Sequence, residues 1–196
     1  MQRPDGTFQK RTRRWETGPL TRYLTFSCYR RIPLLNSPKV RNDLAACLAR
    51  AKEKYSFRLI AWVIMPEHVH LMLEPSKADD VPSILTSIKQ PVAQRLLRSL
   101  RKSQDEALAA ITTPAGEARA WQEGGGFDRN VRTLDELRRE IVYIHHNPVE
   151  RGLVSTPIEW EWSSARWYAE LRADGAGWGG RIPIDKSEVD WGLQNP

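Results

Sequence analysis

The sequence predicts one α+β domain with a ferredoxin-like (split βαβ) antiparallel sheet and helices packed mainly on one face. Two observations support this prediction. Stretches of alternating polarity and stretches with apolar residues three or four positions apart follow one another in the order strand, helix, strand, strand, helix, strand, helix. The 196 residues suffice for one sizeable core and show neither an internal repeat nor a second domain.

The strands are predicted from alternation and from their β-branched and aromatic residues. The first is expected over residues 20–29. The second and third, over 57–64 and 68–74, are joined by the turn Met65-Pro66-Glu67 and should form a hairpin. A bent strand or strand-loop is expected over 121–129, which contains three consecutive glycines.

Two helices are predicted before the last strand. The first begins with Ser37 as N-cap and Pro38 at the first helical position, and should run to about Tyr55. The second begins near residues 79–82. Pro91 falls inside it and should kink or split it.

A third helix follows the last strand. Thr133 and Glu136 form a capping box at its start, with Thr133 as N-cap. The helix should end at about His146, because Asn147 precedes Pro148 and a residue before proline disfavours α geometry.

The chain divides into three parts. Residues 1–19 are basic and polar and should form a flexible arm, which is either a solvated tail or a phosphate contact. Residues 20–168 contain the core, and residues 103–120 within it form an exposed loop with at most a short helical piece. Residues 169–196 form a tail rich in Trp and Gly, without a core of its own.

Composition excludes several classes of protein. No run of about 18 apolar residues exists, so a membrane span is not expected, and the N-terminus lacks the apolar stretch of a secretory signal. Cys28 and Cys47 are expected to be buried, reduced thiols of a cytosolic protein. A net charge of +6 favours a polyanionic partner. The eight tryptophans serve either core packing or stacking on nucleic acid.

The four histidines lie in two short segments. His68 and His70 are two residues apart in a predicted strand, so both point to one face with Cα atoms about 7 Å apart and can converge on one metal ion. Alone, such a pair is more often half-exposed surface than a ligand pair. The other two, His145 and His146, lie between a tyrosine and Asn147.

Tyr143 lies on the third predicted helix about 200° from Ile141, opposite the buried stripe. Asn147, four residues on, shares its face. A single surface tyrosine is usually structural, and a phenol with an unperturbed pKa of about 10 is a poor nucleophile at neutral pH. It becomes competent when a divalent cation polarises the phosphate that it attacks. Two imidazoles and one amide oxygen leave coordination positions open, which fits Mn²⁺ or Mg²⁺.

Basic side chains line the outer side of the second predicted helix. Such a row is usually only a solvated face. Beside a site at which a tyrosine attacks phosphate, the row would contact phosphate instead. The row consists of Lys89, Arg95, Arg98, Arg101 and Lys102.

Several motifs together resemble a known family. Residues 65–70 (MPEHVH) resemble the His-hydrophobic-His motif of HUH single-tyrosine transposases. Residues 143–154 (YIHHNPVERGLV) resemble the nucleophile helix of one branch, the REP-associated tyrosine transposases. Residues 160–164 (WEWSS) and 127–132 (FDRNVR) resemble segments after and before that helix. Glu67 is a departure, because the family commonly has Asn there.

The resemblance implies an HUH-type nuclease fold and a role for each residue. Tyr143 would attack a scissile phosphate of single-stranded DNA and form a 5′-phosphotyrosine link. His68, His70 and Asn147 would hold Mg²⁺ or Mn²⁺, with Glu67 or His146 as a further ligand or as a residue that orients one. Whether His146 or Asn147 is the third ligand is open, and the motif favours Asn147.

The resemblance also implies the partner. The substrate would be a hairpin-forming repetitive extragenic palindrome (REP), handled by a monomer or homodimer in the nucleoid region of the bacterial cytoplasm. Phosphate contacts are expected from Arg11, Arg13, Arg14 and Trp15 of the arm and from Lys89, Arg95 and Arg98.

Two other functions fit the same residues. One is a DNA-hairpin binding protein that descends from such a transposase and no longer cleaves. The other is an unrelated metal hydrolase that uses His68 and His70 with water as the nucleophile.

Overall fold

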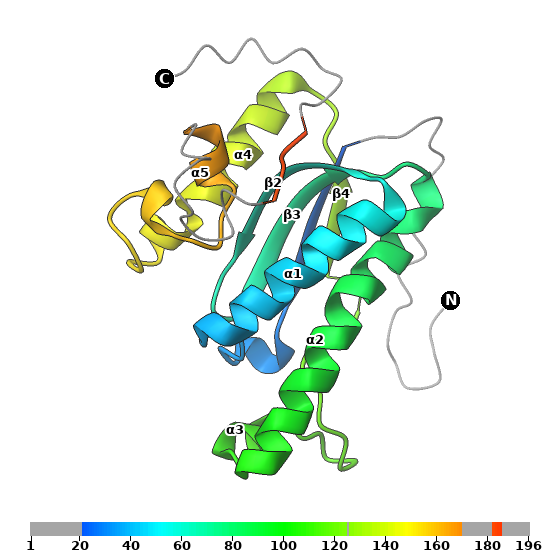
Figure 1. Cartoon of the computed structure of the whole chain (residues 1–196), viewed down its shortest axis with the longest axis vertical. Coiled ribbons are helices and arrows are strands. Elements are labelled where there is room, and N and C mark those ends of the chain that lie inside the picture. Colours follow the sequence, from blue (N-terminus) through cyan, green and yellow to red (C-terminus); the bar gives the residue numbers. More distant parts are fainter. Residues whose placement is uncertain (1–20, 125, 170–181, 186–196) are drawn as a thin grey trace.

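Four antiparallel strands form one sheet within the described residues, 21–124, 126–169 and 182–185 of this computed structural model. The strand order is β2-β3-β1-β4 (Figure 1). Two strand-helix-strand units therefore interleave, and the predicted ferredoxin-like α+β topology is confirmed. The strands are β1 (Arg22–Ser27), β2 (Arg58–Ile64), β3 (His68–Glu74) and β4 (Phe127–Asn130).

The strand register determines which side chains share a face of the sheet. Thr25 of β1 lies opposite His70 of β3, and Tyr23 of β1 lies opposite Arg129 of β4. Residues two apart in a strand point the same way. Tyr23, Thr25, His68, His70 and Arg129 therefore share one face.

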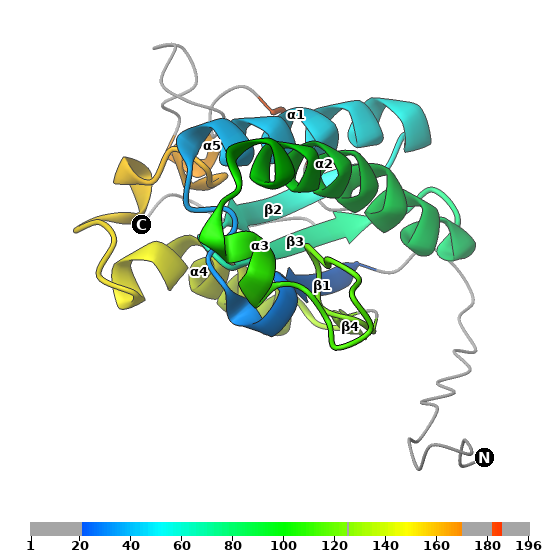
Figure 2. The same cartoon turned by 90° about the horizontal axis from the view of Figure 1, so that it is seen from below.

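Two long helices cover the other face. α1 (Pro38–Tyr55) and α2 (Val81–Ser103) lie side by side as one layer over the sheet, and the short α3 (Glu106–Ala110) follows α2 (Figure 2). The ammonium of Lys89 in α2 lies 5.4 Å from the ring centre of Phe26, which places Phe26 on the α1/α2 face. Its neighbour Thr25 therefore points away from that layer.

Helix α4 (Leu134–Glu150) packs on the face of the sheet that carries His68 and His70. Its apolar stripe, which includes Leu137, Ile141 and Ile144, is buried. Thr133 is its N-cap, as predicted, and accepts a hydrogen bond from the Glu136 amide.

Proline ends neither of the two long helices in which it lies. α2 continues through Pro91, so the predicted split is absent, and the alternative, a kink, stays a prediction. The predicted end of α4 at His146 was wrong, because α4 continues through Pro148 to Glu150. A proline removes one backbone hydrogen bond, whereas both helices bury long apolar stripes whose packing keeps the next turn in place. α4 ends only where Gly152 takes a positive φ of 66°.

The segment before β4 follows the strand-loop alternative of its prediction. The strand begins only at Phe127, and Trp121 makes a single bridge with Cys28. Gly126 has φ of 72°, and a Cβ built there would lie 1.9 Å from the Thr25 carbonyl oxygen. Only glycine fits this close approach of backbone to backbone. Residues 103–120 contain one short helix, α3, as expected.

The Trp-Ser segment after α4 packs against the edge strand β2. The Trp160 indole donates to the Ile64 carbonyl, and the Ile64 amide donates to the Trp162 carbonyl. It is flanked by two short elements, η3 (Pro157–Glu159) and α5 (Ala165–Tyr168). Two further short turns, η1 (Tyr29–Arg31) and η2 (Ala78–Asp80), occur earlier in the chain.

A part of the predicted tail also contacts the sheet. The Asp185 amide donates to the Leu59 carbonyl of β2, and the Leu59 amide donates to the Asp185 carboxylate, which also pairs with Lys52 at 3.0 Å. The arm with Arg11, Arg13, Arg14 and Trp15 lies outside the described residues. No helix in the described part of the chain is long and apolar enough to cross a membrane.

Candidate active site

His68 and His70 lie next to each other on the α4 face of β3. Their ring centroids are 4.7 Å apart, and each side chain is about 5% exposed. The alternation of a strand produces this arrangement, since the intervening Val69 points into the α1/α2 core. The two histidines are therefore adjacent in the structure, as their His-x-His spacing predicted.

Each imidazole contacts neighbouring side chains through its Nδ1 atom. The Nδ1 of His68 lies 3.0 Å from a Glu67 carboxylate oxygen. The Nδ1 of His70 lies 2.7 Å from the Tyr23 hydroxyl and 2.9 Å from the Thr25 hydroxyl. These bonds leave the Nε2 atom of each ring as the nitrogen that can bind a metal.

Burial keeps both imidazoles neutral at pH 7. It lowers the pKa of His68, although Glu67 acts in the opposite direction. Burial, together with the nearby His68 and Arg31, lowers the pKa of His70 to about 3. A neutral imidazole with a free nitrogen is the form that binds a metal.

Helix α4 brings Tyr143 and Asn147 to these histidines. The Tyr143 ring meets the His70 ring edge to face, with centroids 5.5 Å apart. The side-chain amide nitrogen of Asn147 lies 3.4 Å from His70 Nε2. Rotation of that amide by a half turn would present its oxygen instead. Tyr143 is 43% exposed, so a substrate can reach it.

The two histidines after Tyr143 lie elsewhere. His145 is buried, with Nε2 2.9 Å from the Ser164 hydroxyl and its ring against Tyr168. His146 is exposed, and its Nδ1 lies 3.1 Å from the Val142 carbonyl oxygen. Of the two residues left open by the sequence, Asn147 is therefore the one that contacts the histidine pair.

Glu67 is buried and contacts the imidazole of His68. Its carboxylate accepts a hydrogen bond from Arg151 at 2.8 Å as well as contacting His68. The residue that departs from the family motif thus orients one imidazole and is itself held by the residue that follows α4.

The basic row on α2 is not brought to Tyr143. α2 lies on the opposite face of the sheet from α4 (Figure 2). Lys89 lies over the rings of Phe26 and Trp121, and Arg95 pairs with Asp43 at 2.7 Å. Arg98 is exposed in the same layer. Their predicted phosphate contacts stay predictions.

Sequence reasoning missed four residues around the site. Tyr23 and Thr25 alternate toward one face of the first predicted strand, and that alternation could have identified them. Arg129 and Arg151 could not be found in this way, because their partners are set by tertiary packing.

The donors at the site fit a divalent cation in an open mixed site. Two neutral imidazoles and one amide form a nitrogen and oxygen donor set that leaves positions for phosphate oxygens. Within the described residues, no group of three or more His, Cys, Asp or Glu side chains is arranged to hold a metal. A closed site made only of those residue types is therefore absent from that part of the chain.

Comparison with known proteins points first to a class of similar proteins. Residues 20–111, just under half of the chain, match the family described as Transposase IS200 like. A Haemophilus influenzae protein described as a REP-associated tyrosine transposase is 24% identical over 140 residues, which cover 71% of this chain and 76% of that relative. A REP-associated tyrosine transposase of Escherichia coli K12 is 25% identical over 122 residues, which cover 62% of each chain.

A solved structure has the same fold as this chain. The structure of a REP-associated tyrosine transposase bound to a REP hairpin matches with a TM-score of 0.61 and 22% identity, covering 91% of this chain and 96% of that one. The chain is thus similar to the REP-associated tyrosine transposases, and the resemblance expected from its motifs is confirmed.

Proposed function

We propose that the chain cleaves and rejoins single-stranded DNA next to REP-type hairpins, with Tyr143 as nucleophile. One observation carries the proposal, namely the contact between the Tyr143 ring and His70, with centroids 5.5 Å apart. A nucleophile must lie beside the groups that stabilise the charge developing on its target.

In the proposed step, the Tyr143 oxygen attacks the phosphorus of a phosphodiester. The phenol loses its proton, the bond to the 3′ oxygen breaks, and that oxygen leaves as a 3′-hydroxyl after gaining a proton. The product is a 5′-phosphotyrosine link, and attack by a 3′-hydroxyl reverses the step and rejoins the strand.

His68, His70 and Asn147 would hold Mg²⁺ or Mn²⁺. When bound, the cation polarises the phosphate and stabilises charge on the departing oxygen. Glu67 orients His68, while Tyr23 and Thr25 orient His70, so that each ring presents Nε2.

The hairpin substrate is supported by the relatives. Two of them are described as REP-associated tyrosine transposases, and the solved relative was bound to a REP hairpin. The net charge of +6 suits a polyanion.

The test is a covalent adduct. The chain is incubated with 5′- and 3′-labelled single-stranded hairpins and Mn²⁺, and the denatured products are separated by size. The wild type should become covalently linked to the fragment on the 3′ side of the cut, so that the 3′ label moves with the protein and the 5′ label is released on a fragment with a free 3′-hydroxyl. Tyr143→Phe should form no adduct while binding the hairpin with unchanged affinity.

Other outcomes select the rival functions. Hairpin binding without any adduct in the wild type would point to a non-cleaving binding protein. Cleavage that persists in Tyr143→Phe would point to a metal hydrolase that uses water.

A further inference from the structure

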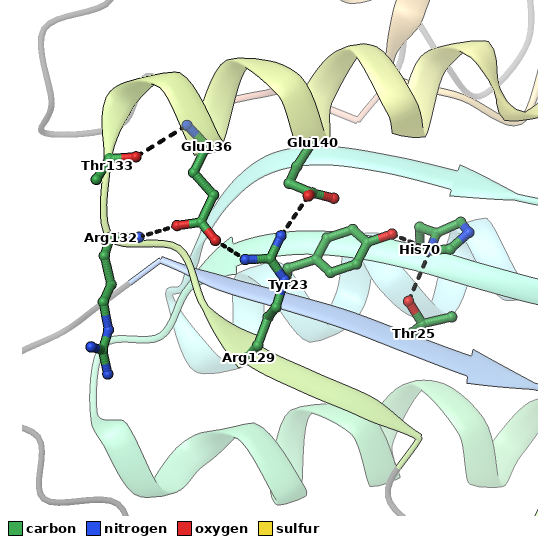
Figure 3. Close-up of polar contacts among 8 residues, drawn as sticks. All are labelled: Tyr23, Thr25, His70, Arg129, Arg132, Thr133, Glu136 and Glu140. Carbon is green, nitrogen blue, oxygen red and sulfur yellow. Dashed lines mark hydrogen bonds and ion pairs between the residues drawn. The ribbon is translucent and has the colours of Figure 1, made fainter.

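Arg129 of β4 joins helix α4 to the sheet beside the candidate site (Figure 3). Its guanidinium bonds to the carboxylates of both Glu136 and Glu140. All three side chains are less than 30% exposed, so these ion pairs are partly shielded from solvent.

On the helix side, the partners of Arg129 share the face that carries Tyr143. Glu136, Glu140 and Tyr143 are spaced by four and three residues and so lie along one side of α4. Glu136 is itself fixed, because its other carboxylate oxygen accepts from the Arg132 amide and its own amide donates to the Thr133 hydroxyl (Figure 3). Arg129 therefore acts on a rigid first turn.

On the sheet side, Arg129 reaches His70 through one residue. Its guanidinium carbon lies 5.6 Å from the ring centre of Tyr23. The Tyr23 hydroxyl lies 2.7 Å from His70 Nδ1, and the two rings stack with centroids 5.6 Å apart and planes at 15° (Figure 3). Tyr23 thus lies between Arg129 and His70.

We propose that Arg129 is a positioning residue that sets Tyr143 and His70 relative to each other through α4 on one side and Tyr23 on the other. Its effect on cleavage rests on the proposed function of Tyr143. Its effect on the geometry of the two rings does not.

Charge gives Arg129 a second effect on the same site. Without the guanidinium, Glu136 and Glu140 would be two unpaired carboxylates on the face of α4 that leads to Tyr143. Like charges repel each other and would repel an incoming phosphodiester. The ion pairs therefore neutralise the approach to Tyr143 as well as fixing the helix.

The test compares two arginines. Arg129→Met removes the guanidinium from the site. Arg119→Met is the matched control, because Arg119 is 30% exposed against 29% for Arg129 and also pairs with two carboxylates, Glu117 and Glu123. In Arg129→Met, the single-turnover rate of adduct formation should fall on the order of 10²-fold, since a small misplacement of reacting groups has an effect of that size. The hairpin Kd should change little, and Arg119→Met should resemble the wild type in both.

A second measurement tests the relative position of the His70 and Tyr143 rings and does not depend on catalytic activity. NMR of the metal-free chain should show shifted signals for the His70 imidazole nitrogens and the Tyr143 ring in Arg129→Met, and wild-type signals for both in Arg119→Met. Arg129→Lys keeps one cation but loses the fork that reaches two carboxylates, and should restore part of the rate. Glu140→Gln, which removes one ion pair, gives an independent variant if Arg129→Met does not fold, and should shift the same two signals.

The outcomes separate this proposal from the proposed function. No adduct in the wild type would overturn the proposed function, while shifted His70 and Tyr143 signals in Arg129→Met would still support the positioning role. Wild-type signals and a wild-type rate in Arg129→Met, or in Glu140→Gln where Arg129→Met is unfolded, would overturn the positioning role alone.

Discussion

The imidazole of His70 and the phenol of Tyr143 meet edge to face, with ring centroids 5.5 Å apart and planes at 75°. Tyr23 stacks on His70 as well, and its hydroxyl is bonded to Nδ1 of that ring. His70 is therefore held by a residue of the sheet while it contacts a residue of α4. The sheet fixes one half of the site and the helix supplies the other.

Glu67 should control metal affinity. Glu67→Gln removes the charge that orients His68, and the loss of such an outer partner typically lowers metal affinity 10- to 100-fold. Mn²⁺ titration by calorimetry measures the effect. Glu123→Gln, at a carboxylate that is 72% exposed, makes the same chemical change in a side chain with no contact to the histidines. Equal Mn²⁺ affinities in the two variants would contradict the role of Glu67.

Ser164 should matter for stability. Its buried hydroxyl bonds to the Trp62 amide and carbonyl and to His145 Nε2. Ser164→Ala leaves those groups without this partner and should lower the free energy of unfolding by about 1–3 kcal/mol. Urea denaturation measures this change in the free energy of unfolding. Ser76→Ala, at an exposed serine, should change stability by less than about 0.5 kcal/mol, and a similar loss in both variants would count against this account.

Gly126 should tolerate no side chain. A Cβ there would lie 1.9 Å from the Thr25 carbonyl oxygen, whereas a Cβ at Gly116, which also has a positive φ, meets nothing within 4 Å. Both alanine variants should incur about 1 kcal/mol of backbone strain. Gly126→Ala should lose a further 1–3 kcal/mol or so from the clash. Thermal denaturation of the pair measures the difference, and equal losses would refute the close approach.

His145 should make the fold sensitive to acid. Burial, together with the neighbouring His146, lowers its pKa to about 3, whereas an unfolded histidine titrates near 6.5. Between these pH values the unfolded chain binds a proton that the folded chain does not, so the free energy of unfolding should fall as the pH drops below about 6.5. Above that pH, His145 should contribute no pH dependence.

The measurement is urea denaturation between pH 8 and pH 5 with EDTA present. His68 and His70 act in the same direction, because burial lowers the pKa of each. A His145→Gln variant should therefore keep part of the slope below pH 6.5 and lose the rest. An unchanged slope would show that His145 is not responsible.

Local periodicity was enough to predict much of the fold and half of the site. The period of two in β3 predicted both its bounds and the pairing of His68 with His70. The spacing of four along α4 predicted that Tyr143 and Asn147 share a face. Both are properties of one element, and a single element can be interpreted from its own residues.

Relations between elements could not be predicted in this way. Pro148 is an unfavourable helical residue by its own chemistry, and only the packing of α4 on the sheet shows why the helix continues. The same holds for Lys89, whose charge suggested a phosphate contact but whose place on the face of the sheet opposite α4 could not be predicted from its own segment. Arg129 looked like any other charged strand residue, because Glu136 and Glu140 become its partners only when α4 folds back onto β4.

Helix α4 is attached to the sheet near both of its ends. Arg129 binds its first turns, and Arg151, directly after its last turn, binds Glu67 at 2.8 Å. Tyr143 lies between these two attachments. For the phenol to swing away carrying a covalently held strand, ion pairs at both ends would have to break. Under the proposed chemistry, these attachments favour an exchange of strands in which the DNA travels while the tyrosine stays in place.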